Sequence, residues 1–106
     1  MNTLYGNFDD LQFDNYKVVL HKKLFWLLLY KDPKTCEQYE KINVSTYLVY
    51  LQKSLDGLNE LLLYPEPMVR LMSNLQAIMI ELRKENFDWK AYRSLVLSAH
   101  KIVDEL

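Results

Sequence analysis

Residues 44–62 read VSTYLVYLQKSLDGLNELL, and this stretch decides the fold. Its apolar side chains recur at steps of three and four residues, at Val44, Leu48, Leu51, Leu55, Leu58 and Leu62. This spacing places them on one face of an α-helix, because a helix completes a turn in about 3.6 residues. The stretch therefore predicts a long amphipathic helix that packs its apolar face against other elements.

Two further stripes with the same spacing follow along the chain. They comprise Met68, Leu71, Leu75, Ile78 and Leu82, and then Tyr92, Leu95, Ala99, Ile102 and Leu106. Tyr64-Pro65-Glu66-Pro67 separates the first of these helices from residues 44–62. Asp88 is suited to cap the last helix, and Phe87 to pack on Tyr92 as a hydrophobic staple. Because the connections are short, we expect antiparallel neighbours in a bundle.

Upstream, the sequence predicts another long helix, which begins near Asp9 or Asp14 and ends at Tyr30, ahead of Pro33. Its second half, residues 24–30, reads LFWLLLY and is apolar on every side. Such a helix either fills the centre of a bundle or offers part of its surface to a partner. Burial is the commoner use, so we expect this helix at or near the centre.

The remaining segments are short. Thr35 and Gln38 have the spacing of a capping box, which predicts a brief helix over residues 36–41. Residues 1–8 show no periodicity and are expected to form a frayed or extended lead-in. We therefore predict a single all-α domain over residues 1–106, built as a four- to five-helix antiparallel bundle.

Composition supports the all-α fold class and also indicates the cellular compartment. Half of the 106 residues are hydrophobic, while the 2 glycines and 3 prolines are too few for the many turns of an all-β fold. The lone Cys36 cannot form an intrachain disulfide, and residues 1–10 lack the pattern of a signal peptide. No apolar run approaches the roughly 20 residues of a membrane span. These features predict a soluble, cytoplasmic protein.

The sequence offers no constellation for catalysis, metal binding or a cofactor. His21 and His100 lie on different helices, each beside lysine, and are expected at the solvent edge. Cys36 has no adjacent base and no glycine-built oxyanion hole, and is expected to be a packing residue. The pairs Glu37–Glu40 and Glu81–Glu85 are expected to be solvated helix faces rather than acid/base pairs. We therefore predict that the protein is not an enzyme and carries no cofactor.

The surplus of aromatic and basic residues points to binding. Several lysines cluster on and after the first helix, near Phe25 and Trp26, and several tyrosines fall beside the main stripes. The methionines of the helix that follows Pro67, namely Met68, Met72 and Met79, are expected to fill the core rather than a docking groove. The candidate partner-binding residues are Lys22, Lys23, Trp26, Tyr30, Lys31, Lys34, Tyr39, Tyr47 and Tyr50.

Three short segments resemble the immunity proteins that protect lactic-acid bacteria from class IIa bacteriocins, those of the enterocin A type. They are Lys31-Asp32-Pro33, Tyr64-Pro65-Glu66-Pro67 and Phe87 to Tyr92, and the resemblance spans residues 19–100. It implies a four-helix bundle whose last segment recognises a bacteriocin-bound permease. This chain departs from that basic family in its sequence pI of about 6.1 and its acidic Asp104-Glu105, so no binding residue is carried over.

The sequence thus predicts a non-catalytic inhibitor or immunity-type protein that acts through a helix face on a protein partner. Two alternatives come from other classes. One is a phage- or plasmid-encoded anti-defence protein associated with nucleic acid, which would use the lysines of residues 17–34; the formal net charge of −1 and the acidic start of the helix disfavour it. The other is a structural homodimer or assembly subunit that would use the tyrosine and methionine faces.

Overall fold

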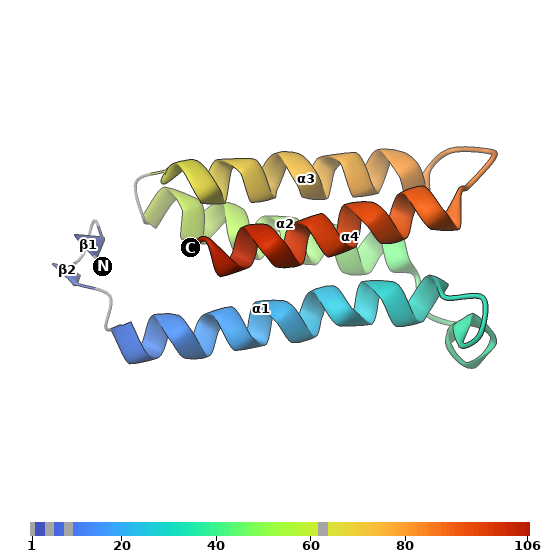
Figure 1. Ribbon diagram of the computed structural model, residues 1–106, viewed down its shortest axis with the longest axis horizontal. Coiled ribbons are helices and arrows are strands. Elements are labelled where there is room, and N and C mark those ends of the chain that lie inside the picture. The colour runs from blue at the N-terminus through green and yellow to red at the C-terminus, as the bar shows by residue number, and fades with distance from the viewer. Residues whose placement is uncertain (1, 4–5, 8–9, 62–63) are drawn as a thin grey trace.

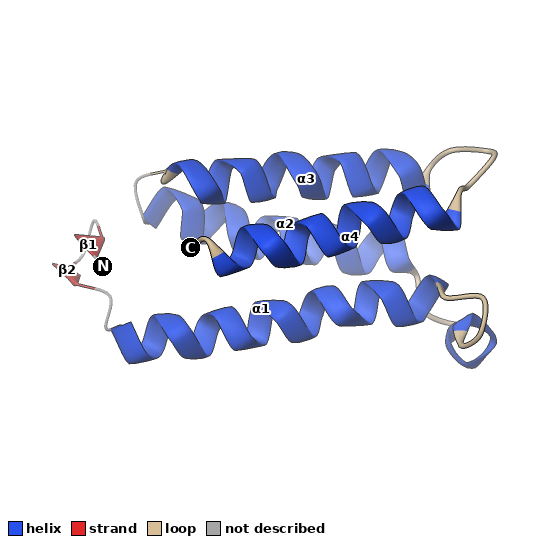
Figure 2. Cartoon of the chain, viewed as in Figure 1, coloured by secondary structure: helices blue, strands red, loops and turns tan. Residues whose placement is uncertain are grey.

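Four long helices account for most of the chain (Figures 1 and 2). The computed structural model describes residues 2–3, 6–7, 10–61 and 64–106. Its elements are β1 (Asn2–Thr3), β2 (Gly6–Asn7), α1 (Asp10–Lys31), the 3₁₀-helix η1 (Cys36–Tyr39), α2 (Val44–Leu61), α3 (Glu66–Leu82) and α4 (Trp89–Asp104).

The four α-helices form an antiparallel bundle, as predicted. In Figure 1, α1 and α3 run in one direction, and α2 and α4 run back in the other. Among the described residues, the short predicted helix at 36–41 is the single 3₁₀ turn η1. At the N-terminus, the two-residue strands β1 and β2 pair antiparallel, with Asn2 opposite Asn7 and Thr3 opposite Gly6. The rest of the predicted lead-in, residues 1, 4–5 and 8, lies outside the described residues.

The predicted stripes form most of the core, although Leu82 at the end of α3 is only partly buried and the buried stripe of α4 is shifted. Val44, Leu48, Leu51, Leu55 and Leu58 of α2 and Met68, Leu71, Leu75 and Ile78 of α3 are buried, while Leu62 lies outside the described residues. On α4 the buried positions are Tyr92, Val96, Ala99 and Val103, so Leu95 and Ile102 sit at the edge of the core instead of in it. The shift arises because two neighbouring sets of apolar residues on this helix both follow steps of three and four, so the spacing alone does not tell which set is buried.

The prediction that the first helix is central is wrong. Leu20, Leu24 and Leu27 bury one side of α1, but Phe25 and Trp26 on the other side are 52% and 40% exposed. In a bundle of four helices each helix occupies a corner, so none is surrounded by the others. The all-round apolar character of residues 24–30 therefore reflects a buried stripe together with an exposed one.

Two tyrosine hydroxyls hold α1 to its neighbours through its backbone. Tyr92 of α4 donates to the carbonyl oxygen of Leu27 at 2.6 Å, and Tyr47 of α2 donates to the carbonyl oxygen of Lys23 at 2.9 Å. A carbonyl oxygen has two lone pairs, so each can accept a hydroxyl in addition to its helical N–H. The two acceptors lie one helical turn apart and receive their donors from different helices.

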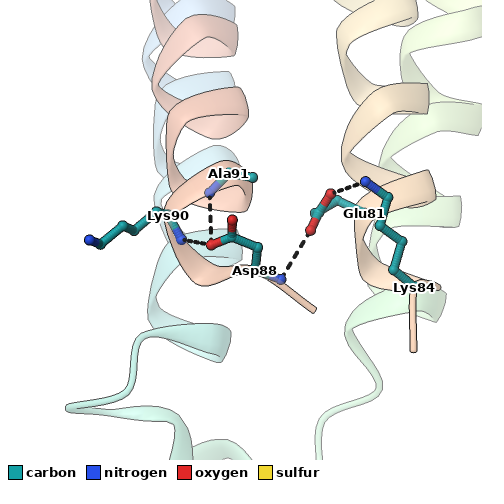
Figure 3. A network of polar contacts seen from close by, with 5 residues as sticks. All are labelled: Glu81, Lys84, Asp88, Lys90 and Ala91. Carbon is teal, nitrogen blue, oxygen red and sulfur yellow. Dashed lines mark hydrogen bonds and ion pairs between the residues drawn. The ribbon is translucent and has the colours of Figure 1, made fainter. Parts of the chain in front are cut away.

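The connection between α3 and α4 is closed by a buried carboxylate (Figure 3). Asp88 caps α4 as predicted, accepting the N–H groups of Lys90 and Ala91. Its own N–H donates to Glu81 at 3.0 Å, and Lys84 pairs with the same carboxylate at 2.9 Å. The expectation that Glu81 is solvated is therefore wrong: it is 4% exposed. The Lys84 ammonium, and next the Asp88 N–H, hold the pKa of Glu81 below its usual value.

The other helix ends agree only partly with the predicted signals. The expected capping box at Thr35 is absent, because its hydroxyl donates to the Leu29 carbonyl at 2.7 Å and so closes the end of α1 instead. Asn43 caps α2 by accepting the N–H of Thr46 at 3.0 Å. The predicted hydrophobic staple is confirmed, with the rings of Phe87 and Tyr92 5.3 Å apart.

Candidate functional site

An open groove lies between α1 and α4. His21, Lys22, Phe25 and Trp26 of α1 and His100 of α4 line about 500 Å³. We call this the α1–α4 groove. Phe25 and Trp26 supply large aromatic surfaces, and the lining also contains one lysine and two imidazoles. Pockets of this size with apolar walls and a few polar groups are typical of binding sites.

An apolar surface on α1 continues from the groove along the helix. Val18 and Val19 are about half exposed and lie seven residues, or two turns, before Phe25 and Trp26. We call these four side chains the outer stripe. Leu20, Leu24 and Leu27 occupy the inward positions of the same turns, so the helical period leaves the outer stripe facing away from the core. Four large apolar side chains gathered on one helix face form a surface of the kind used in protein–protein contacts.

Two histidines that are far apart in sequence meet beside the groove. The Nδ1 atoms of His21 and His100 are 2.7 Å apart, and Nε2 of His21 lies 2.9 Å from Oδ1 of Asp104. The ring planes differ by 3°, and the ring centroids are 5.0 Å apart. A centroid separation that large is compatible with the short Nδ1 contact only if the rings lie edge to edge in one plane. The contact is therefore an in-plane hydrogen bond rather than a face-to-face stack.

The two imidazoles differ in their surroundings. The pKa of His100 is lowered, first by burial and then by the neighbouring His21, while Asp104 acts in the opposite direction. His21 retains about a third of its side-chain exposure, and Asp104 is largely exposed. Both histidines lie at the solvent edge as expected, but the sequence did not predict that they contact each other and connect α1 to α4. In the described part of the chain, their hydrogen bonds and ion pairs join only each other and Asp104.

Several predicted partner-binding aromatics pack on one another instead of forming an open surface. Tyr30 lies between Tyr39 and Tyr47, with ring centroids 5.3 Å away on each side, and Trp26 contacts both Tyr30 and Tyr39. Burial, with a smaller contribution from Tyr30, raises the pKa of Tyr47 to about 12. Tyr50, by contrast, is 70% exposed on α2. Of this aromatic group, Trp26 alone also lines the α1–α4 groove.

The predicted lysines are distributed over several faces. Lys22 lines the α1–α4 groove, whereas Lys23 lines a separate hollow with Tyr47 and Tyr50. The Lys31 ammonium lies 5.3 Å from the centre of the Phe87 ring, and Lys34 is exposed in the turn before η1. The lysines therefore do not gather into one continuous basic surface.

Sequence reasoning missed Phe25, His21 and His100 as members of the site. Phe25 follows His21 by four residues, and Asp104 follows His100 by four, so each pair lies on one helix face. This spacing predicts which side chains lie together on one helix. It does not predict that α1 packs against α4, because 79 residues separate the two histidines.

The described residues contain no group of three or more His, Cys, Asp or Glu side chains arranged to hold a metal ion. No helix among them combines the length and apolar character needed to cross a bilayer. Cys36 is half-buried in η1 and free of any disulfide.

Comparison with protein-family models, with curated proteins and with solved structures finds no match to this chain.

Proposed function

We propose that this protein is a non-catalytic binding protein of the inhibitor or immunity type, whose α1–α4 groove and outer stripe receive an amphipathic, acidic helix of another protein. The observation that carries the proposal is the exposure of Phe25 and Trp26 beside the groove. A stripe along one helix is matched in length and direction by a second helix, which places its own apolar side chains at helical spacing. The resemblance to bacteriocin immunity proteins stays a prediction.

The charges around the groove favour an acidic partner. Lys22 lies in the lining itself, and Lys101 is exposed on α4, next to His100 in the sequence. Opposite charges at the rim of an apolar contact steer the encounter and select among partners. An amphipathic helix with glutamates or aspartates beside its apolar face would supply that complement.

The same charges disfavour a second copy of this chain as the occupant. A twofold contact of α1 on α1, centred on the groove, would bring Lys22 close to its own equivalent. Like charges placed opposite each other at an interface oppose association. Nucleic acid is disfavoured for a different reason, because the lysines of residues 17–34 face in several directions and a backbone-tracking surface needs them aligned.

Fluorescence titration with synthetic helices tests the proposal. The chain has two tryptophans, so Trp89→Phe leaves Trp26 as the reporter. Three peptides of about 18 residues, long enough to form helix, would be compared: a leucine stripe flanked by glutamate, the same stripe flanked by lysine, and a scrambled glutamate peptide. We expect the leucine–glutamate helix to shift Trp26 emission to shorter wavelength and to bind at least about tenfold more tightly than the other two.

Matched variants locate the contact. Phe25→Ser and Lys22→Glu should each weaken binding by about tenfold or more, whereas Ile80→Ser, at an exposed position on α3, should leave it unchanged. Equal binding of the scrambled peptide, or an unaltered affinity in Phe25→Ser, would contradict the proposal. Sedimentation of the free protein provides the last check, since a dimer abolished by Phe25→Ser would assign the surface to a second copy.

A further inference from the structure

We propose that His21 and His100 form a pH-sensitive hydrogen bond between α1 and α4. The bond persists while the two rings together carry at most one extra proton, and the rings separate when they take up a second. The contact lies in the lining of the α1–α4 groove, so its protonation also sets the charge of that surface. The effect on a bound partner rests on the proposed function; the separation of the two rings does not.

The hydrogen-bond geometry fixes where the protons are. Oδ1 of an ionised Asp104 can only accept, so the facing Nε2 of His21 must carry a hydrogen. When both rings are neutral, Nδ1 of His21 is therefore bare and accepts from the Nδ1–H of His100. The order of donation is then His100 to His21 to Asp104.

One added proton can be accommodated without moving either ring. It makes one of the two imidazoles a cation with two N–H groups, and the single hydrogen between the Nδ1 atoms is kept. The negative charge of Asp104 favours this state. The in-plane contact of 2.7 Å is thus compatible with a total of zero or one extra proton.

A second added proton is incompatible with the contact. Each Nδ1 would then carry a hydrogen pointing at the other across 2.7 Å, and two like charges would face each other with no acceptor between them. The rings must separate, and the side chain of His21, which is partly exposed, can turn toward water. The lowered pKa of His100, caused by burial and by His21, agrees with a pair that resists this second charge.

The other charges near the pair lie on α1 and α4, where the lysines disfavour a second added proton and Asp104 favours protonation. On α1, Lys22 shares the groove with both rings, and Lys17, one turn before His21, lies 6.0 Å from the Phe13 ring. On α4, Lys101 is exposed and Asp104 is the acceptor already described.

The next carboxylate along the chain, Glu105, follows the last residue of α4 and is engaged by Arg70 of α3 at 2.8 Å. From α2, the neutral hydroxyl of Tyr47 reaches this part of α1 and donates to the Lys23 carbonyl oxygen. Asp104 is therefore the one carboxylate that the described contacts place on the pair, and it offsets a single positive charge.

The direction of the pH effect follows from the lowered pKa of His100. In the unfolded chain a histidine takes up its proton near pH 6.5, whereas folded His100 does so only at lower pH. The unfolded state therefore binds more protons just below pH 6.5, and stability falls as the pH falls through this window. Above it the contribution of His100 to stability is fully present.

An NMR titration of the full chain from pH 8 to pH 4.5 tests the contact. The chain has two histidines, so His21→Gln and His100→Gln assign the imidazole signals. We expect two protonation steps separated by more than about one pH unit, with amide signals of α1 and α4 around the pair moving in the second step. In either single variant the remaining histidine should titrate in one step.

Two outcomes would overturn the inference: both imidazoles titrating together along one simple curve, or a second step that moves no amide signals of α1 and α4 around the pair. The wild-type titration decides this even if a variant fails to fold.

Binding of the leucine–glutamate helix at pH 7.5 and 5.5 then separates the two proposals. Protonation adds positive charge beside Lys22, so binding should tighten about threefold or more at the lower pH, and His100→Gln should reduce this gain. Absence of binding at both pH values would refute the proposed function. The inference about the His21–His100 hydrogen bond would then depend on the NMR titration alone. Binding without pH dependence would remove the link between them.

Discussion

The hydroxyl of Tyr92 donates to the carbonyl oxygen of Leu27 from a fully buried position, 65 residues away along the chain. A buried phenol without an acceptor would be costly, so this bond also sets how α4 lies against α1. The ring itself packs between Phe87 and Trp89, which fixes the direction of the hydroxyl. The inner side of the α1–α4 contact therefore rests on a neutral hydrogen bond, and its outer side on the histidine pair.

Tyr92→Phe should lower the free energy of unfolding by about 1 kcal/mol, since it removes one buried hydrogen bond and keeps the ring. Urea denaturation measures the change. Tyr50→Phe, at a position 70% exposed, is the matched control and should leave stability unaltered. Burial also raises the pKa of Tyr92, so its stabilising contribution is complete below about pH 10 and is lost at higher pH. An equal effect of the two substitutions would contradict the buried hydrogen bond.

Leu24→Ala and Trp26→Ala should differ strongly although the two residues are only two positions apart on α1, because they lie on opposite faces of the helix. Leu24 is fully buried, so its truncation should cost about 2–5 kcal/mol. Trp26 is 40% exposed, stacks on Tyr30 and meets Tyr39 edge-on, so its truncation should cost about 1 kcal/mol. Thermal or urea unfolding compares them. A loss of several kcal/mol in Trp26→Ala would instead indicate a buried, purely structural indole.

Glu81→Gln should destabilise the protein more than Glu85→Gln, its exposed neighbour one turn later. The amide can still accept the N–H of Asp88, but it loses the charge that attracts Lys84. The pKa of Glu81 is lowered in the folded state, chiefly by Lys84, so its stabilisation is present above the unfolded pKa and is lost as the pH falls through the folded one. Melting temperatures of wild type and Glu81→Gln should therefore converge below about pH 4. A constant gap at all pH values would rule out the charge as the cause.

Tyr64→Gly should be more stable than Tyr64→Ala by about 1 kcal/mol. Tyr64 has a φ of 57°, a left-handed conformation that costs any residue with a Cβ and costs glycine little. Both substitutions remove the exposed ring, so their difference isolates the backbone. Denaturant unfolding of the two variants measures it, and equal stabilities would argue against the left-handed conformation.

The sequence predicts most of the bundle because local spacing is enough to define a buried helix face. The stripes at Leu48, Leu55 and Leu75 needed no knowledge of their partners, and the cap at Asp88 is a local hydrogen-bond pattern. The burial of Glu81 could not be predicted in this way, because it accepts the N–H of Asp88 only after the α3–α4 connection has brought Asp88 back to the end of α3.

The candidate site is less visible for the same reason. Val18, Phe25 and Trp26 have the same apolar character as the core residues beside them, so composition cannot distinguish exposed from buried. That distinction depends on the number of helices packed around α1. The histidine pair depends in addition on the register of α4 against α1, which no short window of sequence contains.

The pairing of α1 with α4 also has a consequence for the order of synthesis. His100 is made 79 residues after His21, which at usual elongation rates is a delay of about 4–16 s. During this interval the leucines of α1 that α4 will cover face water, the other nascent helices or the walls of the ribosome exit tunnel. Hairpins between neighbouring helices can close earlier, because their loops are short. Among the four helices of the bundle, the one that carries the outer stripe is thus translated before the others and is among the last to gain its full set of native neighbours.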